Sequence, residues 1–286
     1  MNLTSPTIIK ELLSKYKTRP SKGLGQNFLI DKNVLRKIIE ASNIKPTDII
    51  LEVGPGIGIL TQELAKHAKK VIAIEKDFTM CEVLKETLSD LKNIQIENCD
   101  ILKFIENWKL KIENYKVVAN IPYYLTSPLI RKFLENPPGG EQPQEIILMI
   151  QKEVAQRICA SPPKMSLLAV SVQFYAEPKI ISYVTKNCFW PAPKIDSAII
   201  NIKPKNNFNK EIDVDAFFKV VKAGFSQPRK QLVNNLTTLK YLDGVKLTKE
   251  EISNWLSKNN LKSNQRAESL TINDWENLTN SFLTLK

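Results

Sequence analysis

Short apolar runs alternate with amphipathic segments along the first two thirds of the chain. Runs of strand type span residues 49–53, 71–75, 94–97, 116–119 and 145–150. Segments with the apolar spacing of a helix span residues 34–41, 59–69, 78–91, 130–134 and 154–158. Asp31 precedes the first of these segments as a predicted N-cap. Strands that alternate with helices predict an α/β domain with a mostly parallel sheet and helices on both faces.

The pattern changes in the second half of the chain. Residues 167–174 fit either a strand or the end of a helix, and residues 178–183 and 197–202 are the last predicted strands. A polar, strand-breaking stretch follows at residues 203–212, and no β pattern lies beyond it. The remaining apolar spacing predicts helices at residues 213–223, 228–239, 248–258 and 271–283. Pro228 suits the first turn of its helix, where no N–H is needed.

These shifts divide the chain into three predicted parts. Residues 1–30 form a basic N-terminal segment, residues 31–205 the α/β domain, and residues 206–286 a small all-helical domain. The first part contains a run of four basic residues with no acid between them, Lys15, Lys17, Arg19 and Lys22.

The net charge of the chain suggests a negatively charged partner. The 286 residues carry a formal net charge of +11, which favours nucleic acid or an acidic membrane surface, although a basic protein without such a partner would look the same. No apolar run reaches the length of a membrane span, and no charged leader precedes an apolar stretch at the N-terminus. With unpaired cysteines as well, the chain is predicted to be cytoplasmic and not bound to a membrane.

The sequence gives no pattern for a metal site. The cysteines are scattered, without a Cys-x-x-Cys pair, at positions Cys81, Cys99, Cys159 and Cys188. His67 is the sole histidine and ends a predicted surface helix, where a solvated role suits it better than a catalytic one. We therefore predict no metal.

A glycine-rich turn between a strand and a helix is the first candidate for chemistry. It runs from Glu52 to Gly58 with glycines spaced G-x-G-x-G. Dinucleotide-binding folds have the spacing G-x-G-x-x-G, which holds a pyrophosphate. The spacing here follows an acid and is that of enzymes that use S-adenosylmethionine, a cofactor without phosphate. A merely tight strand–helix turn is the alternative.

Two acids end the next strands. Glu75 follows the turn by about 20 residues, where a carboxylate can accept both hydroxyls of a ribose; the alternative is a surface ion pair with Lys76. Asp100 ends the third strand and can accept from the amino group of an adenine, a weak indication taken alone.

Asn120-Ile121-Pro122-Tyr123, after the fourth strand, resembles the Asn-Pro-Pro-Tyr type motif of amino-methyltransferases. An adenine amine is conjugated to its ring and is a poor nucleophile, so two oxygen acceptors on its N–H groups would restore electron density to nitrogen. The Asn120 side chain and the Ile121 carbonyl are the predicted acceptors, because Pro122 keeps Ile121 out of the α conformation. Tyr123 offers a stacking face; an ordinary turn is the alternative.

A proline-stiffened loop at residues 189–197 offers a second aromatic face. Phe189 is predicted to sandwich a base against Tyr123, with packing in the core as the alternative. For Trp190, packing in the core is the prediction.

Taken in order, these motifs resemble the bacterial small-subunit ribosomal RNA adenine N6,N6-dimethyltransferases, the kasugamycin-sensitivity family, over nearly the whole chain. The matching pieces are residues 25–29, 52–58, 75, 100, 120–123, 127–129, 151–157, 189–197 and 225–236. The resemblance implies a Rossmann-like S-adenosylmethionine methyltransferase domain, with residues 1–30 at its cofactor site, and a C-terminal domain that binds RNA or the ribosome.

The resemblance also implies a reaction, partners and site residues. S-adenosylmethionine would dimethylate two adjacent adenosines near the 3′ end of small-subunit RNA, and the enzyme would be a monomer that binds the small ribosomal subunit. The implied cofactor residues are Asn27, Leu29, Gly54, Glu75, Asp100 and Asn120. The implied residues for the target base are Asn120, Ile121, Tyr123 and Phe189.

Departures and alternatives remain. Met165-Ser166 replace a usual Tyr-Gly pair, which puts the contacts of that loop in doubt. Pro228-Arg229 replace an arginine pair, which puts one RNA phosphate contact in doubt. The basic run at residues 15–22 and the helix starting at Arg229 are the RNA-binding candidates. Alternative functions are a large-subunit adenine methyltransferase, a non-catalytic RNA-binding or assembly factor, and a nicotinamide oxidoreductase.

Overall fold

The computed structural model of the chain describes residues 1–106, 112, 114–135, 137–205, 212–239 and 246–284. These residues belong to two units, each with its own internal contacts. The first comprises Met1–Ala155 and Ala176–Pro204, and the second comprises Gln156–Tyr175 and Lys205–Lys286. Most of the polar stretch expected to separate two domains, at residues 203–212, lies outside the described ranges.

The division corrects the predicted boundary for one segment. We expected residues 156–175 within the α/β domain, but they pack with the C-terminal helices. Phe174 stacks on Phe217 with ring centroids 4.0 Å apart, and Lys205 Nζ donates to the Gln173 carbonyl at 2.7 Å. Aromatic burial therefore joins a segment from the middle of the chain to the second unit.

A seven-stranded sheet forms the centre of the first unit, in the order β4-β3-β2-β5-β6-β9-β7. Its strands are β2 (Ile49–Val53), β3 (Lys70–Glu75), β4 (Ile94–Asn98), β5 (Tyr115–Asn120), β6 (Ile146–Gln151), β7 (Ala176–Val184) and β9 (Ser197–Pro204). The five strands from β4 to β6 are parallel, and β9 runs antiparallel to both β6 and β7. The prediction of a mostly parallel sheet is confirmed.

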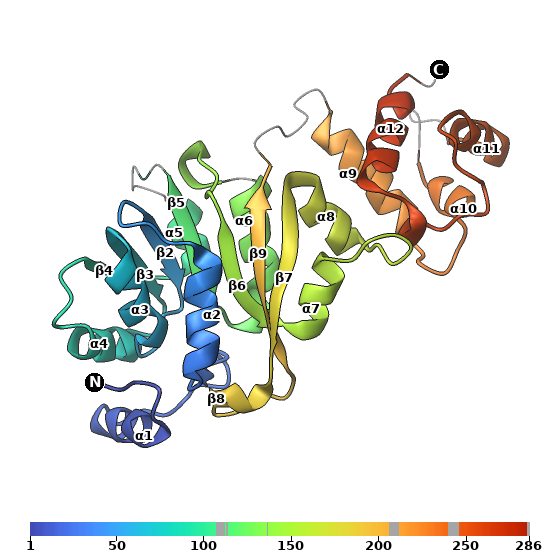
Figure 1. Cartoon of the computed structure of the whole chain (residues 1–286). Coiled ribbons are helices and arrows are strands. Elements are labelled where there is room, and N and C mark those ends of the chain that lie inside the picture. Colours follow the sequence, from blue (N-terminus) through green and yellow to red (C-terminus); the bar gives the residue numbers. More distant parts are fainter. Residues whose placement is uncertain (107–111, 113, 136, 206–211, 240–245, 285–286) are drawn as a thin grey trace. The chain divides into compact units, whose positions relative to one another are not determined.

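Helices cover both faces of this sheet, because its central strands are apolar on both sides. On one face, α2 (Lys32–Ser42), α3 (Ile59–His67) and α4 (Phe78–Thr87) share a hydrophobic cluster with β2, β3, β5, β6 and β9. Behind the sheet lie α5 (Ile101–Glu106) and α6 (Thr126–Glu135), whose Phe133 meets Tyr115 at 6.4 Å between centroids (Figure 1). Asp31 accepts from the Asn33 and Val34 N–H groups, which confirms it as the N-cap of α2.

Some helix ends differ from the prediction. Helix α4 ends at Thr87 rather than continuing to residue 91, because the Thr87 carbonyl accepts from Gln62 Nε2 at 2.8 Å and its hydroxyl donates to the Ile57 carbonyl at 3.0 Å. Helix α3 ends at His67, which is exposed as predicted. Helix α5 was not predicted.

The N-terminal segment joins the first unit through a small second sheet. Helix α1 (Pro6–Lys15) precedes β1 (Phe28–Leu29), which pairs antiparallel with β8 (Phe189–Trp190). The short helix η3 (Lys186–Cys188) comes directly before β8 in the chain. Figure 1 shows α1 and β8 at the same end of the unit. Two segments 160 residues apart in sequence, paired as Leu29 with Phe189, are thereby held together.

The second unit is helical in its described part. Its helices are α8 (Leu167–Tyr175), α9 (Val214–Gly224), α10 (Leu232–Leu236), α11 (Lys249–Lys258), α12 (Ile272–Phe282) and the short η4 (Ala267–Ser269), while α7 (Lys152–Ile158) spans the junction of the units. Residues 167–174, for which strand and helix were both open, are helical. The remaining short helices, η1 (Tyr123–Leu125) and η2 (Pro138–Gly140), lie in the first unit.

One predicted helix of the second unit is much shorter in the structure. Residues 228–239 were expected to be helical, with Pro228 in the first turn, but α10 begins at Leu232 and Pro228 lies in a turn. Asn235 Nδ2 donates to the carbonyls of Gly224 and Gln227 at 2.6 and 3.0 Å, which holds residues 225–231 as a loop. No helix within the described ranges is long and apolar enough to cross a membrane.

Candidate functional site

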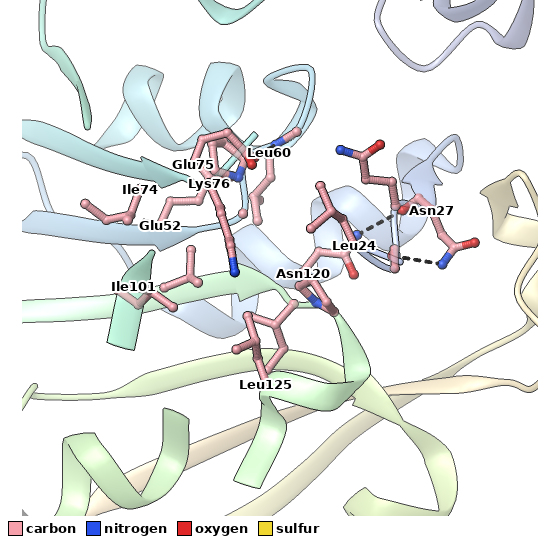
Figure 2. Close-up of a pocket in the computed structure, with 18 of the residues that line it drawn as sticks. Leu24, Asn27, Glu52, Leu60, Ile74, Glu75, Lys76, Ile101, Asn120 and Leu125 are labelled. Carbon is pink, nitrogen blue, oxygen red and sulfur yellow. Dashed lines mark hydrogen bonds between the residues drawn. The ribbon is translucent and has the colours of Figure 1, made fainter. Parts of the chain in front are cut away.

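A pocket opens at the carboxyl ends of the parallel strands, where β2 and β5 are neighbours although β3 and β4 follow β2 in the chain. Open α/β sheets bind ligands at such a switch in strand order. The pocket measures about 1100 Å³ including its open mouth. Every site residue expected from the sequence lines it: Asn27, Leu29, Gly54, Glu75, Asp100, Asn120, Ile121, Tyr123 and Phe189. Figure 2 shows Glu75, Asn120 and Asn27 on different sides of this space.

The glycine-rich turn forms the floor of the pocket. Gly54, Gly56 and Gly58 have φ values of 67°, 59° and 92°, a region that side chains disfavour. A Cβ on Gly56 would also lie 3.2 Å from the Phe28 ring, so the turn is packed tightly against the N-terminal segment. Backbone rather than side chain is therefore presented to a ligand here.

Glu75 is held rigidly at the end of β3. Its Oε1 accepts from the Asp77 N–H at 2.8 Å and its Oε2 from the Gly56 N–H at 3.1 Å, while only 6% of the residue is exposed. Burial raises the pKa of the carboxyl above its ordinary value. Each oxygen keeps a lone pair, so the group can accept two further hydroxyl donors.

Glu52 is a second buried acid on the same side of the pocket. It is 1% exposed, and its Oε2 has no hydrogen-bond partner among the described residues. Burial raises the pKa of Glu52 to about 8, so the group is largely protonated at neutral pH. The sequence marked this acid as part of the turn but gave no sign of its burial.

The alternative for Glu75, a surface ion pair with Lys76, is not formed, because Lys76 pairs with Asp100. The distance from Lys76 Nζ to Asp100 Oδ2 is 2.9 Å, and both residues line the pocket. The hydrogen bond from Lys76 lowers the pKa of Asp100. The other oxygen, Oδ1, accepts from the Leu102 N–H at 2.9 Å in the first turn of α5.

The opposite side of the pocket contains the neutral acceptors. Asn120 ends β5 and donates from Nδ2 to the Asn27 carbonyl at 3.4 Å, so Oδ1 of the same amide remains available as an acceptor. Pro122 follows with φ −55° and ψ 134°, outside the helical region. The Ile121 carbonyl accepts no backbone hydrogen bond within the part of the chain that the structure describes.

Aromatic residues flank these acceptors. Tyr123 is half-buried, its hydroxyl lies 3.0 Å from Ser197 Oγ, and burial raises its pKa. Phe189 is 4% exposed and reaches the pocket from β8, while Trp190 packs partly buried against the core, as predicted. Tyr124, which none of the sequence motifs marks as a site residue, also lines the pocket and is 54% exposed.

The N-terminal segment closes one wall of the pocket. Leu24 to Leu29 line it, and Gln26 Nε2 donates to Asp77 Oδ2 at 3.0 Å. The basic run of this segment is partly neutralised, because Lys15 Nζ lies 2.7 Å from Glu86 Oε2. Lys17, Arg19 and Lys22 are exposed, with no ion pair among the residues described.

Comparisons with known proteins agree with this geometry. The family described as "Ribosomal RNA adenine dimethylase" matches residues 17–282. Proteins called "Ribosomal RNA small subunit methyltransferase A" from Alkaliphilus oremlandii and Clostridioides difficile are each 41% identical, covering 98% and 99% of this chain and 98% and 97% of their own lengths.

Two solved structures are similar in fold. The dimethyladenosine transferase of Plasmodium falciparum superposes with a TM-score of 0.73 and 28% identity, covering 90% of this chain and 98% of that one. The 23S rRNA methyltransferase ErmE superposes with a TM-score of 0.70 and 26% identity, covering 91% of this chain and 100% of that one. The chain thus has a Rossmann-like methyltransferase fold and belongs to the ribosomal RNA adenine dimethylase family.

Proposed function

We propose that the protein transfers methyl groups from S-adenosylmethionine to N6 of two adjacent adenosines near the 3′ end of small-subunit ribosomal RNA, giving N6,N6-dimethyladenosines. The observation that carries the proposal is the pair of neutral oxygens, Asn120 Oδ1 and the Ile121 carbonyl, at a pocket whose other side has acidic strand ends. The proposed partner is the small ribosomal subunit, and the proposed place of action is the cytoplasm.

The donor side of the pocket suits S-adenosylmethionine. Glu75 is buried and fixed, with lone pairs left for two ribose hydroxyls. Asp100 is an ionised acceptor suited to an adenine amino group, and the glycine turn lets backbone approach the ligand closely. Asn27, Leu29, Gly54 and Asn120 complete the proposed donor contacts.

The acceptor side suits an exocyclic amine. Bound S-adenosylmethionine supplies an electrophilic methyl group on sulfur. Asn120 Oδ1 and the Ile121 carbonyl accept the two amine N–H groups, which directs the nitrogen lone pair out of conjugation and toward the donor. Neither acceptor is a strong base that could take the proton first. The nitrogen therefore gains the methyl group before it loses its proton. Tyr123 and Phe189 flank the base and offset part of the stacking energy lost when it leaves the RNA.

A large-subunit adenine methyltransferase is the competing assignment. It is favoured by the structural similarity to ErmE, at 26% identity. The small-subunit assignment is supported by relatives named for that subunit at 41% identity over nearly their full lengths. Residues 229–236, which begin at Arg229, also match the small-subunit motif by sequence.

Methyl transfer to purified, unmethylated small subunits tests the proposal, with the modified positions mapped by mass spectrometry. We expect dimethylation of adjacent adenosines by the wild-type protein and almost none by Asn120→Ala. Transfer confined to large subunits would support the competing assignment. Binding of RNA without any transfer would instead point to an assembly factor.

A further inference from the structure

The adenine end of the proposed donor site contains a cation of the protein itself. Lys76 Nζ lies 2.9 Å from Asp100 Oδ2. Figure 2 shows the Lys76 side chain leaving the end of β3 and extending into the pocket between Glu75 and Leu125. The side chain is 57% exposed, so its ammonium lies at the solvent-facing side of the site.

The two oxygens of Asp100 are not equivalent. Oδ1 accepts from the Leu102 N–H at 2.9 Å and thereby satisfies a backbone donor in the first turn of α5. Oδ2 is bound to a side chain that can move into water. An amino group that approaches Asp100 therefore meets one oxygen engaged with backbone and one engaged with Lys76.

We propose that Lys76 occupies the adenine subsite in the free protein and is displaced from Asp100 by the adenine of the methyl donor, so that Lys76 lowers donor affinity. This inference rests on the proposed function, since it takes the donor to be an adenosine derivative. Lysine ammonium and adenine amino groups are both N–H donors. Each Asp100 oxygen keeps a lone pair, but the Lys76 side chain extends into the pocket space beside Asp100, so an adenine that enters there must displace it.

Displacing Lys76 from Asp100 costs little free energy. Asp100 is the one acid within ion-pair distance of Lys76 in the described ranges. Neighbouring Asp77 is engaged, accepting from the Thr79 N–H through Oδ1 and from Gln26 through Oδ2. The released ammonium passes into solvent without burial, so only the exposed ion pair is lost.

Calorimetric titration with adenosine and with S-adenosylhomocysteine tests the inference. Lys76→Met keeps the aliphatic stem and removes the charge, and we expect it to bind both probes about two- to fivefold more tightly, the range expected for one exposed ion pair. Lys85→Met is the matched control. Lys85 is 64% exposed and pairs with Glu82 at 2.6 Å on α4, away from the pocket lining, so its removal should leave both affinities unchanged.

Asp100→Asn provides the second arm. In this background the ion pair is absent, so adding Lys76→Met should no longer tighten binding. Raising the salt concentration should likewise bring the wild-type affinity toward that of Lys76→Met, because salt screens an exposed pair.

Unchanged or weaker binding of both probes by Lys76→Met would overturn the inference, as would a gain that persists with Asn at position 100. If the wild-type protein bound neither probe, the proposed donor site itself would be wrong. Normal wild-type binding together with no gain in Lys76→Met would leave the proposed function intact and remove only the role of Lys76.

Discussion

The two sides of the pocket are built from different chemistry. The donor side holds acidic side chains at strand ends, with Glu75 fixed by two backbone N–H groups and Glu52 fully enclosed. The acceptor side holds neutral oxygens and aromatic faces, from Asn120 to Tyr123 and at Phe189. One side is suited to hold a polar ligand tightly, and the other to position a weak nucleophile without removing its proton first.

The difference predicts separable defects. Changes on the donor side should affect the equilibrium binding of the donor, whereas changes on the acceptor side should affect the rate of transfer at saturating donor. If changes on either side altered donor binding and the rate of transfer equally, this division would be wrong.

The largest expected effect is on the acceptor side. Asn120→Ala removes an oxygen placed for the target amine, and loss of one positioned polar group of this kind lowers turnover by about 100- to 1000-fold. The affinity for S-adenosylmethionine should change far less. Single-turnover methyl transfer and calorimetry on the same preparation measure the two quantities, and near-normal turnover would refute the role of Asn120.

The next largest effect is on the donor side. Glu75→Ala removes an acceptor proposed for the ribose, and hydrogen bonds to a charged group are worth about 1.5–3 kcal/mol, so the donor Kd should rise about 10- to 100-fold. Turnover at saturating donor should be largely retained. Glu82→Ala, which removes a partly exposed acid from α4, is the control and should bind donor normally. Thermal melting checks that each variant is folded.

Tyr123 tests stacking on the acceptor side. Tyr123→Ala loses the ring, and stacking worth about 1–3 kcal/mol per base predicts a loss of RNA-dependent turnover of about 5- to 100-fold. Tyr123→Phe keeps the ring and loses only the contact between its hydroxyl and Ser197 Oγ, so its loss should be small. Equal losses in donor binding and turnover would argue against stacking.

The last expected effect concerns stability rather than binding or turnover. Glu52 has a pKa of about 8 in the folded protein against 4.5 for the ordinary group. Between these values the folded state holds a proton that the unfolded state has lost, so stability falls as pH rises from about 4.5 to 8. Glu52→Gln should remove this component, at most about 1.4 kcal/mol per pH unit. Denaturant titrations from pH 5 to 9 should therefore show a shallower pH dependence for the variant; identical slopes would contradict the burial argument.

Much of this site was predictable because parallel strands end at the same edge of a sheet. Glu75, Asp100 and Asn120 each follow an apolar run, so their convergence needed only the strand assignments. The bond between Lys76 and Asp100 was not predictable, since it joins the ends of two strands through a long flexible side chain. The burial of Glu52 depends on packing around it, which a single sequence does not report.

The errors in the predicted fold also have physical causes. Residues 167–174 are apolar except for Ser171 and Gln173, so their periodicity could not separate strand from helix. The helix expected from residue 228 is shortened because the Asn235 amide and the Gln265 carbonyl bind the loop and Leu232 from elsewhere in the fold. Such tertiary hydrogen bonds override local propensity.

The most direct test is a crystal structure of the protein with S-adenosylhomocysteine and adenosine bound. Asn120 Oδ1 and the Ile121 carbonyl should each lie about 2.7–3.2 Å from N6 of the target adenosine, with that nitrogen facing the sulfur. A base bound with N6 out of reach of both oxygens, or pointing away from the sulfur, would contradict the account.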